Sequence, residues 1–177
     1  ISIADAKRGD IGNSSRYYAE SVFEHCNFDS ITVSPYMGKD SLMPFLNYDK
    51  GVFILCLTSN KGANNLQKKI SENNLEVYKH VINMAVSMNK NNNVGLVVGA
   101  TNEKYLAQIK SLSSDLPWLM PGVGYQGGDL NQSIRFGEKK GLSIINVSRG
   151  ILNYKDGTIK DIRYATEEYT NKIREIL

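Results

Sequence analysis

Six short runs of apolar, β-favouring residues alternate with longer amphipathic stretches, and this alternation constrains the fold of the chain most strongly. The runs are almost continuously apolar, as expected for strands that are buried on both faces. Helices between such strands imply right-handed βαβ crossovers and one parallel sheet. The predicted strands are Ile1–Ala6, Ser30–Ser34, Val52–Leu57, Val94–Val98, Trp118–Met120 and Ser143–Val147. The predicted helices are Ser15–His25, Asp40–Leu46, Leu75–Asn89, Glu103–Leu112 and Ile159–Ile176.

Polar and glycine residues gather directly after most of these strands. Both (β/α)8 barrels and open doubly wound sheets place their ligands at the carboxyl ends of the strands, so this position does not distinguish the two folds. Six βα units are two fewer than a barrel contains, and 177 residues fall short of the roughly 250 that are typical of one.

Composition excludes few function classes but weakens several. A net charge of +3 with scattered lysines gives little support for nucleic-acid binding, which usually needs a basic stripe. No apolar run approaches the ~18 residues of a membrane span. Cys26 and Cys56 sit in apolar surroundings without C-x-x-C spacing, so we expect two reduced core thiols in a cytoplasmic protein.

The stretch DAKRGD carries the strongest chemical signal. Asp5 and Lys7 lie two positions apart on a predicted strand, so their side chains should point to the same face, and Asp10 follows after Gly9. Flanking carboxylates favour the ammonium form of Lys7. Such a lysine suits donation of a proton to a carbanion, or its electrostatic stabilisation, better than Schiff-base formation. A surface ion-pair cluster has the same composition, and the motif alone does not exclude it.

Three further loops contain groups that suit a polar ligand. MPGVGYQGGD places four glycines and Gln126 after a strand, where amides can approach an oxyanion, although a flexible loop has the same composition. INVSRG offers the Ser148 amide and the Arg149 guanidinium to a phosphate. LTSNKGA contains Ser59, which either reads a ligand edge or belongs to a turn or helix cap. No group of His, Cys and acidic residues has metal-ligand spacing, so no metal is expected.

In this order, the motifs DAKRGDIGNS, SPYMGKDSLMPF, LTSNKGA, GLVVGAT, MPGVGYQGGD and NVSRGIL resemble those of the orotidine 5′-phosphate decarboxylase family, in its longer bacterial-type branch. The resemblance implies a (β/α)8 TIM barrel that acts as a homodimer with shared active sites and has no cofactor. It implies a lyase of pyrimidine synthesis that converts orotidine monophosphate (OMP) to UMP and CO2.

The resemblance also implies roles for the DAKRGDIGNS residues. Lys7 resembles the lysine that protonates C6 of the pyrimidine as CO2 leaves, and Asp5 resembles the aspartate set against the substrate carboxylate. Asp10 resembles the aspartate that reaches into the neighbouring subunit's site, with Ile11 and Ser14 following it across the interface.

The resemblance also implies that residues of the later motifs contact the rest of the substrate. Ser59 resembles the hydroxyl residue that reads the pyrimidine edge, and Pro121 the proline packed beside the ring. Gln126 and Arg149, with the backbone at Ser148, resemble the phosphate grip. Two departures stand in loops: Lys61 replaces a frequent proline and Tyr125 a frequent alanine.

The resemblance also bears on how much of the barrel this sequence contains. The family's first two strands, which supply another aspartate and another lysine, have no counterpart before Ile1. We therefore expect residues 1–177 to form a single domain, the carboxy-terminal three-quarters of a barrel, whose activity in isolation is doubtful. The alternatives are a metal-dependent sugar-phosphate decarboxylase or aldolase of the same superfamily, and a catalytically inactive phosphate-binding barrel.

Overall fold

The computed structural model describes the chain except for residues 72, 100–102, 114, 124–128 and 138–142. Its centre is one six-stranded sheet in which every neighbouring pair is parallel and the spatial order follows the chain order. The strands are β1 (Ile3–Arg8), β2 (Ser30–Val33), β3 (Gly51–Leu57), β4 (Val94–Val98), β5 (Trp118–Pro121) and β6 (Ser143–Asn146). This sequential parallel order is that of a barrel wall and not of a doubly wound sheet, whose strand order reverses.

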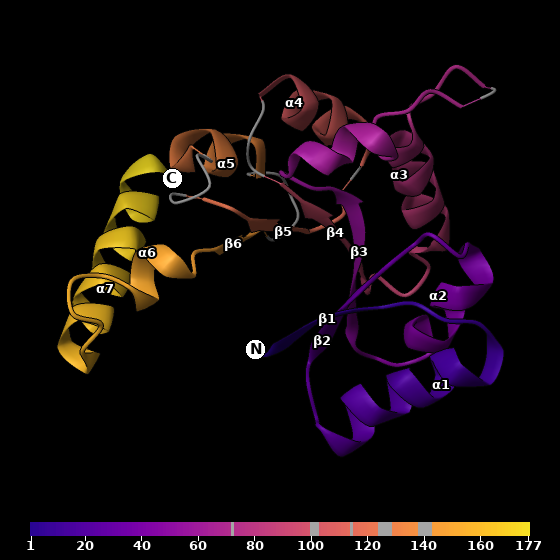
Figure 1. Cartoon of the computed structure of the whole chain (residues 1–177), viewed down its shortest axis with the longest axis horizontal. Helices are drawn as coiled ribbons and strands as arrows, with labels where there is room; N and C mark the ends of the chain where they lie inside the picture. The colour runs from indigo at the N-terminus through magenta and orange to yellow at the C-terminus, as the bar shows by residue number, and fades with distance from the viewer. Residues whose placement is uncertain (72, 100–102, 114, 124–128, 138–142) are drawn as a thin grey trace.

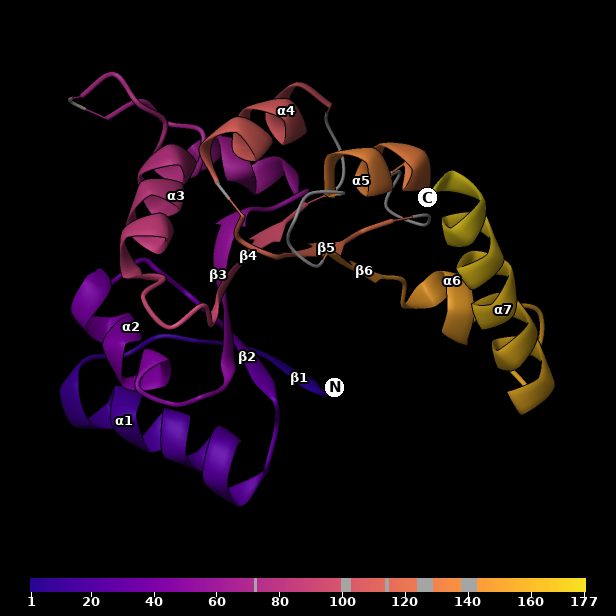
Figure 2. The ribbon, with the colours of Figure 1, turned by 180° about the vertical axis from the view of Figure 1, so that it is seen from behind.

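Helices cover the outer face of this curved sheet in an arc, and its inner face carries none of the labelled helices (Figures 1 and 2). The longer ones are α1 (Gly12–Glu20), α2 (Lys39–Leu46), α3 (Val77–Met88), α4 (Glu103–Leu112), α5 (Leu130–Gly137) and α7 (Ile159–Ile176). Shorter pieces are the π-helical turn η1 (Ser21–His25), the 3₁₀ turn η2 (Lys61–Asn65) and α6 (Arg149–Leu152). Strands β1 and β6 are the two edges of the sheet, and α6 and α7 lie beyond β6 (Figure 1).

The alternation of side chains along each strand divides the apolar residues into two sets. One set packs between the sheet and the helices and includes Ile31, Ile54, Leu96 and Trp118, all at most 2% exposed. The other set lies on the inner face, where Phe53, Val97 and Leu119 are buried against the partly buried Ile3, Leu55 and Ile144. Because both faces of the central strands are covered, they read in the sequence as continuous apolar runs.

All six predicted strands and all five predicted helices are present. Strand β1 is shifted two residues toward the carboxyl end relative to its prediction, so that Lys7 belongs to the strand. Helix α5 was not predicted, because its apolar positions are few and it follows a glycine-rich loop. The prediction of two core thiols was wrong for Cys26, which is exposed directly after η1, and right for Cys56, which is buried.

Helices in the described part of the chain are either too short or too polar to cross a lipid bilayer. The longest, α7, carries charged residues along its length and begins with a capping box between Thr158 and Asp161.

Candidate active site

A cavity of about 330 Å³ lies on the inner face of the sheet, at the carboxyl ends of the strands. Its lining follows the two-residue period of a strand, because alternate side chains point inward. The apolar base is formed by Ile3, Leu55, Val97, Leu119 and Ile144. Two residues further along their strands stand Asp5, Gly99, Pro121 and Asn146, and Lys7 and Ser148 follow after two more. The cavity is therefore apolar at its base and polar toward the loops.

Five of the ten predicted site residues line this one cavity, and they come from widely separated parts of the chain. They are Asp5, Lys7, Ser59, Pro121 and Ser148. Asp5 and Lys7 lie on edge strand β1, Ser59 follows β3, Pro121 ends β5, and Ser148 follows β6. A parallel sheet accounts for this convergence, since the ends of all its strands meet at the same edge.

The charged pair of the cavity lies on β1. Lys7 Nζ donates a hydrogen bond to Asp5 Oδ1 at 2.5 Å. The same carboxylate oxygen accepts a hydrogen bond from Thr32 Oγ1 at 2.9 Å, and Thr32 belongs to the neighbouring strand β2. About half of the Lys7 side chain is exposed. The pair therefore contributes little to stability, but it presents an oriented ammonium and carboxylate to the cavity.

The ionised form of Asp5 is favoured in this arrangement. Partial burial acts to raise the pKa of the carboxyl group, but the hydrogen bonds from Lys7 and Thr32 and the positive charge of Lys7 together outweigh it. The net effect is a pKa below the usual value for aspartate. Asp5 is therefore a carboxylate at neutral pH and an acceptor for both donors.

The loop after β3 is held by a side chain from the segment before α3. Gln67 accepts a hydrogen bond from the Thr58 backbone amide at 2.8 Å and donates one to Thr58 Oγ1 at 2.8 Å. Thr58 Oγ1 also lies 2.6 Å from Asn60 Oδ1. Ser59 is the central residue of this braced turn and lies against the end of β4, where Gly99 allows the two backbones to approach closely.

The predicted phosphate residues are only partly located. Ser148 lines the cavity, and its hydroxyl accepts a hydrogen bond from Asn146 Nδ2 at 3.3 Å. Arg149 is the first residue of α6 and is exposed, but it is not part of the cavity lining. Gln126 and Tyr125 lie outside the described residues. The sequence analysis missed Asn146, although its position two residues after Ile144 on β6 places it on the cavity face.

Three predicted residues lie away from the cavity. Asp10 is half-buried after β1, and its carboxylate accepts a hydrogen bond from the Ile11 amide at 2.8 Å. Ile11 precedes helix α1 and is 60% exposed, and Ser14 is exposed in the first turn of that helix. None of the three lines the cavity that this chain forms.

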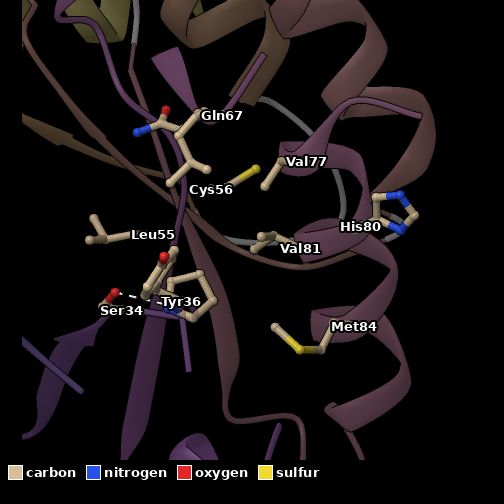
Figure 3. Close-up of a pocket in the computed structure, with 11 residues that line it drawn as sticks. Ser34, Tyr36, Leu55, Cys56, Gln67, Val77, His80, Val81 and Met84 are labelled. Carbon is tan, nitrogen blue, oxygen red and sulfur yellow. Dashed lines mark hydrogen bonds between the residues drawn. The ribbon is translucent and has the colours of Figure 1, made fainter. Parts of the chain in front are cut away.

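A larger hollow of about 410 Å³ lies on the other side of β3, against α3 (Figure 3). Leu55 and Cys56 point to opposite sides of β3, and Cys56 faces Val81 and Met84 of α3 (Figure 3). Burial raises the pKa of the Cys56 thiol, so it stays protonated. This hollow is mostly apolar, and none of the described residues that line it forms an ion pair, so the smaller cavity is the better candidate for chemistry despite its size.

No three His, Cys, Asp or Glu side chains in the described part of the chain are grouped closely enough to hold a metal ion. Near the larger hollow, His80 Nε2 lies 2.6 Å from Ser71 Oγ, away from the charged cavity.

Comparison with known proteins identifies the family. The model of the "Orotidine 5'-phosphate decarboxylase / HUMPS family" matches residues 1–160. A curated orotidine 5′-phosphate decarboxylase of Dehalococcoides mccartyi is 47% identical over 164 residues, which are 89% of this chain and 61% of that protein. One of Haloarcula marismortui is 47% identical over 153 residues, 85% of this chain and 55% of the relative. The chain thus spans about three-fifths of the length of these relatives.

Solved structures agree with this relationship. The OMP decarboxylase of Leishmania donovani superimposes with a TM-score of 0.88 at 42% identity, covering 98% of this chain and 67% of that one. The UMP synthase of the same organism gives a TM-score of 0.87 at 43% identity, covering 98% of this chain and 39% of that one. The six parallel strands are accordingly part of a (β/α)8 barrel fold. The chain belongs to the orotidine 5′-phosphate decarboxylase / HUMPS family.

Proposed function

We propose that the full-length protein decarboxylates OMP to UMP and CO2 in pyrimidine nucleotide synthesis, without a metal or organic cofactor. The observation that carries the proposal is the single cavity that Asp5 and Lys7 share with Ser59, Pro121 and Ser148. OMP has a pyrimidine ring that carries a carboxylate, a sugar and a phosphate, and the polar residues lie around an apolar base that suits a pyrimidine face.

In the proposed reaction, the bond between C6 and the substrate carboxylate breaks, CO2 leaves, and the electron pair stays on C6. The Lys7 ammonium donates its proton to that carbon, and the neutral amine regains a proton from solvent. Asp5, set against the substrate carboxylate, orients Lys7 through the 2.5 Å hydrogen bond. Fixed charges that already point at the developing carbanion need no reorganisation during the reaction, which is how they lower its barrier.

The remaining roles concern binding. We assign Ser59 to the pyrimidine edge, Pro121 to the ring face, and Gln126, Arg149 and the Ser148 amide to the phosphate. Binding energy from the phosphate end can hold the reacting end in its charged surroundings, so these contacts support turnover as well as affinity.

We also propose that the protein is a homodimer in which Asp10, Ile11 and Ser14 serve the partner's site. Their position supports this: all three follow β1 closely, yet none lines the cavity of its own chain. Mixing full-length Lys7→Ala with full-length Asp10→Ala tests it. If sites are shared, half of the mixed dimers' sites carry both defects and half carry none, so random exchange restores about a quarter of wild-type activity. No recovery, despite exchange of subunits, contradicts sharing.

Two wider features complete the proposal. Residues 1–177 act as one domain that supplies six of the eight βα units of the barrel, and the sequential parallel order of the strands supports this. The unpaired state of both cysteines supports a cytoplasmic location.

The test of the activity is loss of OMP absorbance with full-length protein in the presence of a chelator. Turnover under these conditions supports the proposal. Activity on sugar phosphates that requires a divalent metal would instead indicate a sugar-phosphate decarboxylase or aldolase of the same superfamily. UMP binding without turnover would indicate an inactive barrel. The names of the relatives do not favour either alternative.

A further inference from the structure

Thr32 is a polar residue in the middle of a fully buried strand of the sheet. All four residues of β2 are buried, and Thr32 is completely so. Its neighbours Ile31 and Val33 pack into the core between the sheet and the helices. A hydroxyl in such a position is costly unless both its donor and its acceptor functions are used.

The hydroxyl of Thr32 is hydrogen-bonded to both ends of the D-x-K motif. Thr32 Oγ1 accepts a hydrogen bond from the Lys7 backbone amide at 3.0 Å and donates one to Asp5 Oδ1 at 2.9 Å. A hydroxyl has one proton, so donation to Asp5 fixes its orientation and leaves its lone pairs for Lys7. One buried group therefore fixes the carboxylate that holds the lysine and also the backbone from which the lysine side chain extends.

The backbone at Lys7 needs such a support. Lys7 has a φ of 47°, in the left-handed region that residues other than glycine rarely adopt. It lies within an irregular part of β1, between the pairing of Ala4 with Ile31 and that of Arg8 with Val33. Irregularities of this kind redirect a side chain, and unusual backbone conformations persist where surrounding contacts hold them. At Lys7 this contact is the hydrogen bond that the backbone amide donates to the side-chain hydroxyl of Thr32.

We propose that Thr32 is a positioning residue, whose buried hydroxyl holds Asp5 and Lys7 in the arrangement from which Lys7 acts on the substrate. The role of Lys7 in this inference rests on the proposed function, whereas the hydrogen bonds of Thr32 to Asp5 and Lys7 do not depend on it. Thr32 does not line the cavity, so it has no direct role in binding the nucleotide.

The kinetic test compares Thr32→Val with Thr32→Ser in the full-length protein. Valine keeps the shape of threonine but removes both hydrogen bonds, whereas serine keeps the hydroxyl. Because Thr32→Val loses a hydrogen bond to a charged group, we expect its kcat to fall by about 10- to 100-fold, with KM and UMP affinity close to wild type. Thr32→Ser should recover most of that loss. Equal kcat values for Thr32→Val and wild type, or equal losses in both variants, would overturn the proposal.

A matched control separates positioning from general loss of stability. Ser113 is equally buried, and its hydroxyl accepts a hydrogen bond from Trp118 Nε1 at 3.2 Å, on the helix side of the sheet. Ser113→Ala should lower the melting temperature but leave kcat and KM unchanged. If Ser113→Ala reduces kcat as strongly as Thr32→Val, loss of a buried hydroxyl alone explains the effect and the proposal fails.

A second measurement does not depend on turnover. The carboxyl carbon of Asp5 can be titrated by NMR in wild type and in both variants. The charged group that acts on Asp5 is Lys7, and Thr32 is its uncharged partner from β2. Without the Thr32 donor the Asp5 pKa should rise in Thr32→Val and stay near the wild-type value in Thr32→Ser. An unchanged Asp5 pKa in Thr32→Val overturns the proposal. If wild-type protein does not decarboxylate OMP, the proposed function fails while this titration still decides whether Thr32 sets the state of Asp5.

Discussion

Replacing Gly99 by alanine should damage the candidate site more than the fold. Gly99 directly follows β4, is buried, and lines the cavity. A Cβ atom added there would stand 2.7 Å from the Ser59 backbone nitrogen and 3.0 Å from the Thr58 carbonyl carbon. Both neighbours are backbone atoms, so no change of rotamer can relieve the contact. Because ordinary contacts begin near 3.4 Å, the Ser59 segment must retreat by roughly 0.7 Å.

Such a displacement has two separate consequences. Overpacking of this size costs about 1–3 kcal/mol of the free energy of unfolding. A shift approaching 1 Å in a residue that contacts the substrate can cost about 100-fold in rate, so we expect kcat/KM for OMP to fall by about 10- to 100-fold. The assays are urea unfolding and steady-state decarboxylation with the full-length protein.

The same strand supplies a control. A Cβ atom at Gly95 would meet the Phe53 ring at 2.6 Å and the Pro117 carbonyl oxygen at 2.9 Å, near the amino end of β4 and away from the polar end of the cavity. Gly95→Ala should therefore lower stability to a similar degree but leave kcat/KM close to wild type. Wild-type kinetics in Gly99→Ala, or an equal kinetic loss in Gly95→Ala, would refute the reasoning that the end of β4 positions Ser59.

Three further substitutions test the assigned roles in the full-length protein. Lys7→Ala should nearly abolish turnover while UMP still binds, because the phosphate grip is intact; retained decarboxylation would remove the proton-donor role. Arg149→Ala should raise KM and also lower kcat if phosphate contacts assist the chemical step, as steady-state kinetics will measure. Lys61→Pro should be tolerated, with urea unfolding showing a gain of about 0.4–1 kcal/mol, because Asn60 before it is already extended (ψ 154°) and Lys61 is the first residue of η2. A loss of stability there would mean that the Lys61 amide is needed.

The strands and their order were predictable because strands that are buried on both faces appear in the sequence as continuous apolar runs. All five residues of β4 are buried, so no face of it tolerates polar residues, and its run reads as a strand without any alternation. Helix α3 was predictable for the opposite reason, since its buried residues Tyr78, Val81, Ile82 and Ala85 form one stripe at helical spacing. Helix α5 has only three large apolar residues, Leu130, Ile134 and Phe136, which is too little to indicate a helix from the sequence.

The site was predictable only in part, because the motifs give residue types but not how they are held. Local spacing placed Asp5 and Lys7 on one face, and their ion pair bears this out. The same spacing gave no indication of the left-handed backbone at Lys7, whose amide donates its hydrogen bond to a residue 25 positions later. The bracing of Thr58, the residue before Ser59, by Gln67 likewise joins residues across a turn that has no periodic pattern.

Thr32 illustrates why the sequence is least informative about such supports. Threonine is a favoured strand residue for its branched shape alone, so its presence in the run SITV predicts β2 and needs no further explanation. Only the adjacent strand reveals that its hydroxyl is bound on one side by an amide and on the other by a carboxylate. A residue chosen only for strand propensity is replaceable by valine, whereas one chosen for these two hydrogen bonds is replaceable only by serine. Comparing Thr32→Val with Thr32→Ser therefore decides whether Thr32 only helps to form β2 or also positions Asp5 and Lys7 for the reaction.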